Sequence, residues 1–304
     1  SIWSEIPPAA PPTDRTLVLI LTSGFLVIAA TIRPERRETN ASEDGRRTMT
    51  LYDVHAHLTD PRVRSRAEEL VSASRRHGVA GILATAARHD EWGDIAKLST
   101  LSPVVGAVGV HPFFAGEWRP PMAAELQGLA ADTPEIRAIG EIGLDAWEGR
   151  QDIALQIEAL VPQLYVAQQL DLPVIVHNRK SWNEFFKVLD SLGLDTLRGA
   201  CHGFNGSREL TRQVLDRGLM VSFGGPITYD NASRLRAAAA YVPLDRVLTE
   251  TDCPDLPAQE VRPGPSLPQH VRYTLDAIAR ARGERVETIA EHVGENYRRL
   301  LGIA

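Results

Sequence analysis

The sequence is poor in features that define several classes of protein. It has only two cysteines in 304 residues, so no disulfide framework can be argued, and a reducing compartment such as the cytoplasm is expected. Because no Cys-x-x-Cys pair occurs, a zinc ribbon is excluded, and histidines and carboxylates must hold any metal ion. The net charge of −6 gives no global basic field, so a nucleic-acid substrate would have to meet a local patch.

A membrane-spanning apolar run is also missing. The candidate, residues 17–32, has 16 residues, fewer than the roughly 20 that a transmembrane helix needs. Membrane association is therefore not expected unless this run is a true anchor. The run lies in a segment that opens with prolines and ends in an Arg-rich stretch. Met49 directly precedes the first expected strand, so we hypothesise that Met49 is the true start and that residues 1–48 are a poorly ordered or non-native extension outside the fold.

Residues 49–304 have the length and rhythm of a parallel barrel. Their number is close to the roughly 250 residues of a (β/α)₈ barrel. Short β-rich runs alternate with amphipathic helical stretches, which is typical of repeated βα units. We therefore predict an α/β fold of the TIM-barrel type. The expected strands are Leu51–His57, Gly81–Ala86, Val104–His111, Ala138–Leu144, Val174–His177, Gly199–His202, Leu219–Phe223 and Val247–Asp252. Helices are expected at Arg64–His77, Asp152–Gln169, Leu267–Arg282 and Val286–Leu300.

Histidines and carboxylates lie at or near the carboxyl ends of the expected strands. In a barrel these ends converge on one face, where active sites are built. One architecture would therefore bring together residues that are far apart in the sequence. These residues are His55, His57, His111, Glu141, His177, His202 and Asp252.

The pair His55 and His57 has the spacing of two ligands to one ion. Residues i and i+2 of a strand point to the same side, and imidazole suits zinc and similar transition metals. Without His111, the set still has four histidines and two carboxylates, more than one tetrahedral ion needs. Two ions that share a bridging carboxylate are the simpler interpretation. Two such ions can clamp the attacking and leaving oxygens of a phosphoryl transfer.

Six motifs, in order, resemble the TatD family of metal-dependent deoxyribonucleases within the amidohydrolase superfamily. The resemblance covers almost all of residues 51–300 and includes the late segment Asn296–Leu300. It implies an amidohydrolase-like (β/α)₈ barrel. The motifs are Asp53-Val54-His55-Ala56-His57-Leu58, Gly109-Val110-His111-Pro112, Gly140-Glu141-Ile142-Gly143-Leu144-Asp145, Val176-His177-Asn178-Arg179, His202-Gly203-Phe204 and Glu250-Thr251-Asp252-Cys253-Pro254.

The resemblance also implies a ligand set for two divalent ions, which could be Mg²⁺, Mn²⁺ or Zn²⁺. His55, His57 and Asp252 would hold the first ion. His177 and His202 would hold the second ion. Glu141 would bridge the two ions.

Roles in catalysis follow from the same resemblance. Asp252 and Glu141 would be the catalytic residues, with Asp252 as the general base. His111 would bind or orient a substrate phosphate, and Arg179 is placed for a phosphate contact.

The implied activity is hydrolysis of ester bonds, specifically the metal-dependent cleavage of DNA phosphodiesters. DNA is the expected partner, and no stable protein partner is implied. Candidates for base stacking are Trp118, Trp147, Trp182 and Phe204,. The alternative is an amidohydrolase-type enzyme that acts on an amide, ester, lactone or aminoacyl bond. The intact ligand set argues against a non-catalytic binding protein.

Three further acidic residues have more than one interpretation. Asp53 is expected to support the ligands or to begin the strand. Glu250 could support the metal site or pair with a neighbouring strand, and Asp145 could orient a ligand or cap the next helix. The chain departs from the family pattern at Phe113, where many members have a further histidine, and in residues 261–268.

Overall fold

The computed structural model describes residues 21–22, 25–26, 49–149 and 152–303. The chain divides into two compact units, Ser1–Arg47 and Thr48–Ala304, and each is described by itself. In the first unit, β1 (Leu21–Thr22) pairs with β2 (Phe25–Leu26) in antiparallel fashion. The rest of the hypothesised extension lies outside the described residues. Among the helices that the structure describes, none is long and apolar enough to cross a membrane.

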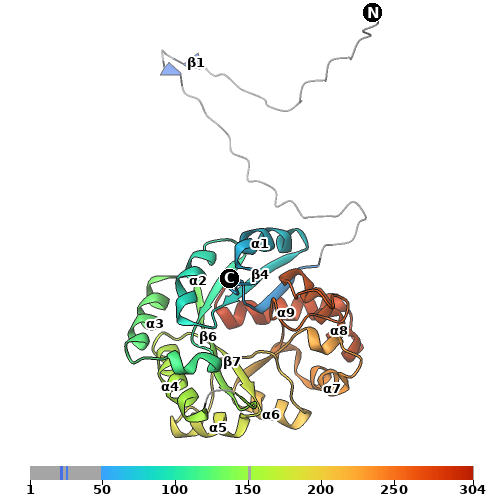
Figure 1. Cartoon of the computed structure of the whole chain (residues 1–304). Coiled ribbons are helices and arrows are strands. Elements are labelled where there is room, and N and C mark those ends of the chain that lie inside the picture. Colours follow the sequence, from blue (N-terminus) through green and yellow to red (C-terminus); the bar gives the residue numbers. More distant parts are fainter. Residues whose placement is uncertain (1–20, 23–24, 27–48, 150–151, 304) are drawn as a thin grey trace, which may run out of the picture. The chain divides into compact units, whose positions relative to one another are not determined.

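The second unit is the predicted (β/α)₈ barrel. Eight parallel strands form one sheet in sequence order, and Figure 1 shows the helices arranged around them. The strands are β3 (Leu51–Ala56), β4 (Val79–Thr85), β5 (Val104–Val108), β6 (Ile136–Asp145), β7 (Val174–Arg179), β8 (Gly199–Cys201), β9 (Leu219–Phe223) and β10 (Val247–Thr249).

The helices follow the predicted alternation with the strands. The long helix α4 begins after Asp152, whose side chain accepts a hydrogen bond from the Ala154 N–H at 3.0 Å, as an N-cap residue does. It buries Leu160 and Leu164, which are four residues apart and so lie on one face,. The helices are α1 (Ala67–Arg76), α2 (Trp92–Leu98), α3 (Pro121–Asp132), α4 (Ile153–Gln169), α5 (Trp182–Ser191), α6 (Arg208–Asp216), α7 (Ser233–Tyr241), α8 (Val271–Arg282) and α9 (Val286–Leu301).

A compact apolar cluster fills the inside of the barrel. Each of the eight strands contributes one residue to it, and α9 contributes Tyr297, Leu300 and Leu301. A second, larger cluster packs the outer faces of the strands against the helices. Because both faces of each strand are covered, the strands read as nearly continuous apolar runs. The strand residues of the inner cluster are Val54, Leu83, Ala107, Ala138, Ile175, Ala200, Met220 and Leu248.

The barrel closes between its first strand, β3, and its last strand, β10. The other neighbouring strands pair through ladders of at least three residue pairs, some with a register shift, whereas the described residues show one isolated bridge here, between Ala56 and Cys253. Lower in this seam, the Thr249 hydroxyl donates to the Tyr52 carbonyl at 2.8 Å. The seam is therefore closed by few backbone contacts, and they lie near the ends of the strands.

Candidate metal centre

The structure brings the seven polar residues together at the carboxyl end of the barrel. Their side chains form one connected set of contacts around Glu141. His55, Glu141 and His177 lie within β3, β6 and β7, whereas His57, His111, His202 and Asp252 lie beyond strand ends.

Five strands end earlier than the sequence suggested, three of them by one residue and two of them by three residues. The third strand of the barrel stops at Val108 rather than His111, because His111 is the N-cap of the 3₁₀ helix Pro112–Glu117. The last strand stops at Thr249 rather than Asp252, and Asp252 has φ of 54°, which a strand does not accommodate. Both side chains therefore project from turns at the rim of the barrel.

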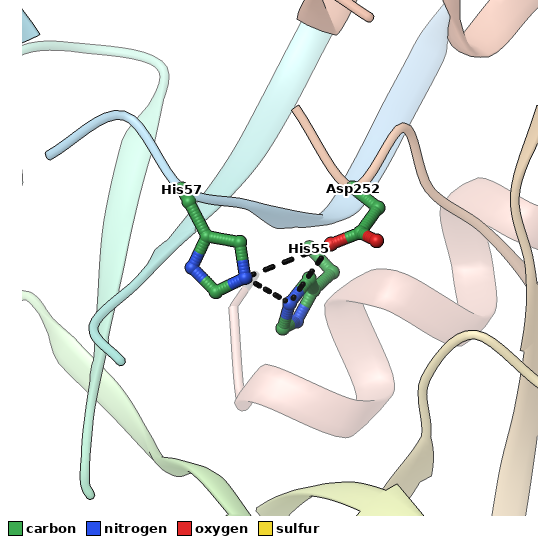
Figure 2. A group of neighbouring side chains, drawn as sticks. All are labelled: His55, His57 and Asp252. Carbon is green, nitrogen blue, oxygen red and sulfur yellow. Dashed lines mark hydrogen bonds and ion pairs between the residues drawn. The ribbon is translucent and has the colours of Figure 1, made fainter. Parts of the chain in front are cut away.

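The first ligand group consists of His55, His57 and Asp252, whose polar atoms point toward one another in Figure 2. The two Nε2 atoms lie 3.1 Å apart. One carboxylate oxygen of Asp252 is 3.6 Å from each of them. Such a cluster of buried electron-pair donors is the arrangement that a cation requires.

The second ligand group consists of His177 and His202. The Nδ1 atom of His177 lies 3.3 Å from Nε2 of His202. Oε1 of Glu141 is 2.9 Å from the first nitrogen and 2.7 Å from the second. This group therefore offers two imidazole nitrogens and one carboxylate oxygen.

Glu141 faces both groups, with one oxygen toward each. Its Oε2 lies 3.2 Å from Nε2 of His55 and 3.3 Å from Nε2 of His57, whereas Oε1 serves the second group. The side chain is 1% exposed, and Oε2 has no hydrogen bond of normal geometry within the described chain. Burial opposes ionisation, but the surrounding histidines, His202 and His111 most strongly, hold the pKa of Glu141 well below its usual range. The carboxylate is therefore charged and able to bridge two cations.

The glycine two residues after Glu141 allows β6 and β7 to approach closely. Gly143 has φ of 149°, and a Cβ atom at this position would overlap the backbone carbonyl of His177. A side chain at residue 143 would thus push β7, and with it the ligand His177, away from Glu141. This packing requirement explains the second glycine of the Gly-x-x-Gly pattern around Glu141.

Neighbouring groups fix the orientation of the ligand rings. His57 contacts the Thr85 carbonyl through Nδ1 at 3.0 Å, which leaves Nε2 for an ion. Nε2 of His177 lies 2.9 Å from Oδ2 of Asp145, so its Nδ1 faces Glu141. Asp145 thus orients His177, a candidate ligand. Such outer contacts set the tautomer and basicity of metal-binding histidines.

Glu250 supports the second group from behind His202. Its Oε1 lies 3.5 Å from Nδ1 of His202 and accepts a hydrogen bond from the Gly203 N–H at 2.6 Å. The structure therefore favours the supporting role for Glu250 over a purely strand-pairing role.

Asp53 supports the first group through the backbone. Its Oδ1 accepts hydrogen bonds from the N–H groups of His55 at 3.2 Å and Thr251 at 2.9 Å. Its Oδ2 accepts a hydrogen bond from the Thr251 hydroxyl at 2.5 Å. Burial raises the pKa of Asp53 to about 8, although the hydrogen bonds from Thr251 oppose this rise. Asp53 thus lies behind the ligands, as the sequence suggested.

His111 contacts the centre as a hydrogen-bond donor. Its Nδ1 accepts a hydrogen bond from the Phe113 N–H at 3.0 Å, so the proton of the neutral ring is on Nε2. Nε2 lies 3.3 Å from Oε1 of Glu141, and burial lowers the pKa of His111 to about 4. A neutral ring that points an N–H into the site suits a contact with an oxygen of a substrate better than a metal bond.

Two ligand residues of the first group have opposite pKa shifts. Burial lowers the pKa of His55 to about 3. Burial also disfavours the charged form of His57, but the nearby carboxylates of Glu141 and Asp252 outweigh this effect and raise its pKa to about 9. In Asp252, burial raises the pKa to about 6, although the charges of His202 and His57 lower it. In the metal-free site, His57 therefore holds a proton that a cation would displace.

Two cations, Arg179 and Lys180, pack against the ring of Trp147 beside the second group, and we call these three residues the cationic rim. The guanidinium carbon of Arg179 lies 3.9 Å from the Trp147 ring centroid, and Nζ of Lys180 lies 3.8 Å from it. The backbone N–H of Trp147 donates to Oδ1 of Asp145 at 2.8 Å, so the rim is connected to His177. Neither cation forms an ion pair with a carboxylate of the described residues. The rim therefore carries two cations that could meet an anion, one of which also acts on the charge of Asp145,.

The donor set fits a pair of divalent ions. It combines four imidazole nitrogens with the carboxylates of Glu141 and Asp252, a mixture that suits zinc and harder ions alike. The unsatisfied Oε2 of Glu141 is the feature that a bound ion would satisfy. The neighbouring thiols of Cys201 and Cys253 are buried, and burial raises the pKa of each well above its usual range, so thiolate ligands are not favoured.

Sequence reasoning missed two residues near the centre. Thr251 was included in a motif but given no role of its own. A hydroxyl between Glu250 and Asp252 at a strand end nevertheless indicates local hydrogen bonding. Lys180 was not considered, although it directly follows Arg179. Its role depends on its contact with Trp147, which lies 33 positions earlier in the sequence, and no local pattern reports such a contact.

Comparison with known proteins gives consistent results for sequence and structure. The model of the family described as TatD related DNase matches residues 52–302. A protein of Pantoea ananatis named 3'-5' ssDNA/RNA exonuclease TatD is 32% identical over 260 residues, which cover 83% of this chain and all of that protein. An uncharacterized metal-dependent hydrolase of Bacillus subtilis, YabD, is 30% identical over 254 residues, which cover 83% of this chain and 99% of YabD.

Among solved structures, the chain is similar to YJJV, a TatD homologue of Escherichia coli. The TM-score is 0.78 at 28% sequence identity, and the match covers 84% of this chain and 98% of YJJV. The relatives are thus matched over nearly their whole length, and the matched region contains every residue of the candidate metal centre.

Proposed function

We propose that this chain, which belongs to the TatD related DNase family and is a metal-dependent hydrolase, cleaves phosphodiester bonds of DNA with two divalent ions at the candidate metal centre. Glu141 carries the proposal, because each of its oxygens faces a separate group of histidines. That geometry suits two ions joined by one carboxylate. When bound, two such ions would activate a water molecule and stabilise charge on the oxygens around phosphorus.

The side chains of this chain would then perform three tasks. Asp252 projects from the rim into the first group, and it would accept the proton of the attacking water as general base. His111 would donate its Nε2–H to a non-bridging oxygen of the scissile phosphate. Arg179 would hold a phosphate next to the second group.

The cationic rim supports a phosphodiester over a neutral amide or lactone. Arg179 and Lys180 form no ion pair with a carboxylate of the described residues, although the charge of Arg179 contributes to the lowered pKa of Asp145. An exposed cation pair at a site mouth would stabilise an anionic substrate, whereas an uncharged substrate gains little from it. The name of the Pantoea ananatis relative, an exonuclease on single-stranded DNA and RNA, agrees with this choice.

The test is cleavage of labelled single-stranded DNA by the purified protein with Mg²⁺, Mn²⁺ or Zn²⁺, beside an Asp252→Asn variant and a chelated control. We expect cleavage by the wild-type protein alone and none after chelation. Equal background cleavage by both proteins would reject the proposed nuclease activity. Turnover of lactone, amide or aminoacyl esters in its place would assign the alternative hydrolase activity.

A further inference from the structure

We infer that Asp53 is a positioning residue that closes the barrel seam at the level of the metal ligands and sets how far His55 and His57 lie from Asp252. The inference uses the proposed function only in that the first group binds an ion. It concerns the order and geometry of metal binding, and the nature of the substrate does not enter.

The first ligand group spans the weakest junction of the sheet. His55 and His57 lie at the end of β3, whereas Asp252 follows β10, and these two strands have no regular ladder between them in the described chain. Two backbone hydrogen bonds cross the seam here: Asp252 N–H to His55 carbonyl at 3.0 Å, and His57 N–H to Cys253 carbonyl at 2.7 Å. Any opening of the seam would therefore separate ligands of the same ion.

Asp53 ties the two sides of the seam together through one carboxylate. It accepts one hydrogen bond from its own strand, from the His55 N–H. It accepts two from the opposite side, from the N–H and the hydroxyl of Thr251. All of these groups are buried, so water cannot replace the contacts, and an unpaired donor here is costly. Thr251 directly precedes Asp252, and Asp53 lies two residues before His55, so a shift of these contacts would move the proposed ligands.

The second ligand group depends less on the seam, which reaches it through Glu250, the residue after β10 that lies 3.5 Å from His202. Glu141 and His177 lie on the adjacent strands β6 and β7, and His202 follows β8, which pairs with β7 in register. Its support away from the seam is Asp145, whose Oδ2 contacts His177 at 2.9 Å. The two ions would thus be held by separate supports, Asp53 for the first and Asp145 for the second.

This separation predicts which ion is lost in which variant. Loss of an outer support costs about 10–100-fold in metal affinity. Asp53→Ala and Thr251→Val should each weaken the first site by that factor and leave the second site near its wild-type affinity. Asp145→Asn should have the reverse effect. Thr251→Ser keeps the hydroxyl and should restore tight binding at the first site.

A control for general seam stability is available lower in the same junction. The Thr249 hydroxyl donates a hydrogen bond to the Tyr52 carbonyl, and each residue lies three positions from the nearest proposed ligand, Asp252 or His55. Thr249→Val should therefore lower thermal stability without changing the affinity of either ion. If Asp53 acted only by stabilising the fold, Thr249→Val would reproduce the effect of Asp53→Ala on metal binding.

The experiment is calorimetric titration of the metal-free, full-length protein and its variants with Mn²⁺, together with electron paramagnetic resonance of the loaded samples. The wild-type protein should bind two ions and show the spin coupling of a bridged pair. Asp53→Ala and Thr251→Val should show one tight ion without coupling, and Thr251→Ser should show two. If Asp53→Ala does not fold, the Thr251→Val and Thr251→Ser pair decides the question.

Three results would overturn the inference: wild-type affinities for both ions in Asp53→Ala and Thr251→Val, equal weakening of both sites, or a Thr249→Val variant with the same metal defect. A wild-type protein that binds fewer than two ions would overturn it as well, together with the two-ion centre. If the wild-type protein binds two ions but cleaves no DNA, only the proposed nuclease activity is rejected. The inference on Asp53 stands, because its readout is metal binding.

Discussion

The N–H of Asp252 donates a hydrogen bond to the carbonyl of His55 at 3.0 Å, so two residues that are 197 positions apart are connected through their backbones as well as through their side chains. The connection holds the Asp252 carboxylate over the first ligand group, where its Oδ1 is equidistant from both Nε2 atoms. This placement allows Asp252 to contact an ion and a bound water together.

Replacement of Asp252 by asparagine should abolish most activity while preserving the fold. The amide has nearly the same shape but cannot accept the proton of the attacking water, and general-base catalysis contributes about 10²–10⁴-fold. We expect kcat on single-stranded DNA to fall by that factor at saturating Mn²⁺. Circular dichroism should be unchanged, and a variant with more than a tenth of wild-type kcat would contradict the role.

Glu141→Gln should affect both ions together, in contrast to the supporting residues. Each carboxylate oxygen serves one group, and the amide nitrogen of glutamine would place a donor where one ion needs an acceptor. Mn²⁺ titration should show both affinities reduced by at least the roughly 100-fold that loss of an outer support can cost. Retention of one tight ion would show that Glu141 is not a bridge.

Metal loading should depend on pH in one direction. In the metal-free protein the carboxylates around His57 overcome the effect of burial and raise its pKa to about 9, so at pH 7 its ring is protonated and an ion must displace that proton. Apparent affinity at the first group should rise about tenfold per pH unit up to about pH 9 for one displaced proton.

Calorimetry in two buffers of different ionisation enthalpy, such as Tris and Hepes, reports the proton released at pH 7.5. The matched condition is pH 9.5, where the release should be much smaller. An affinity that stays constant between pH 7 and pH 9 would show that His57 is already neutral before the ion binds.

The cationic rim should contribute to the binding of single-stranded DNA through its charge. Arg179→Gln and Lys180→Asn each remove one cation, and asparagine tolerates the φ of 58° at residue 180,. If each cation meets one phosphate, either substitution should lower the slope of log affinity for single-stranded DNA against log salt by about 0.7. Filter binding at several salt concentrations, with Ca²⁺ in place of the active ion, measures this slope.

The matched control for the rim is Lys187→Gln, which removes an exposed cation from α5 outside the rim. It should leave the slope unchanged. If all three variants changed the slope equally, binding would follow the overall charge of the protein and no local phosphate contact would be needed.

Removal of residues 1–48 should leave the barrel functional. Every residue of the candidate metal centre and both core clusters belong to the unit Thr48–Ala304. A chain that begins at Met49 should therefore retain the Tm and the kcat/KM of the full-length protein within about twofold. A large loss of either would assign residues 1–48 a part in folding or catalysis.

Much of the fold could be predicted because parallel strands that are buried on both faces leave a clear apolar pattern. The candidate ligands could be found because each lies near the carboxyl end of a strand or just beyond it, and the topology then determines that they meet. The turn positions of His111 and Asp252 could not be predicted from the sequence, because Pro112 and the backbone at Asp252 set conformations that an apolar run does not indicate. The hydrogen bond from Thr251 to Asp53 was also hidden, since it joins the two ends of the barrel sequence.

The apolar cluster inside the barrel has a consequence for access. Residues from all eight strands fill the interior, and Tyr297, Leu300 and Leu301 of α9 pack against them, so a nucleic-acid strand has no passage through the barrel to the other side. Glu141, near the carboxyl end of the barrel, is 1% exposed. If the substrate is a polynucleotide, as we propose, it would enter and leave on the same side of the barrel, and a free end meets that requirement more easily than a bond in the middle of a duplex.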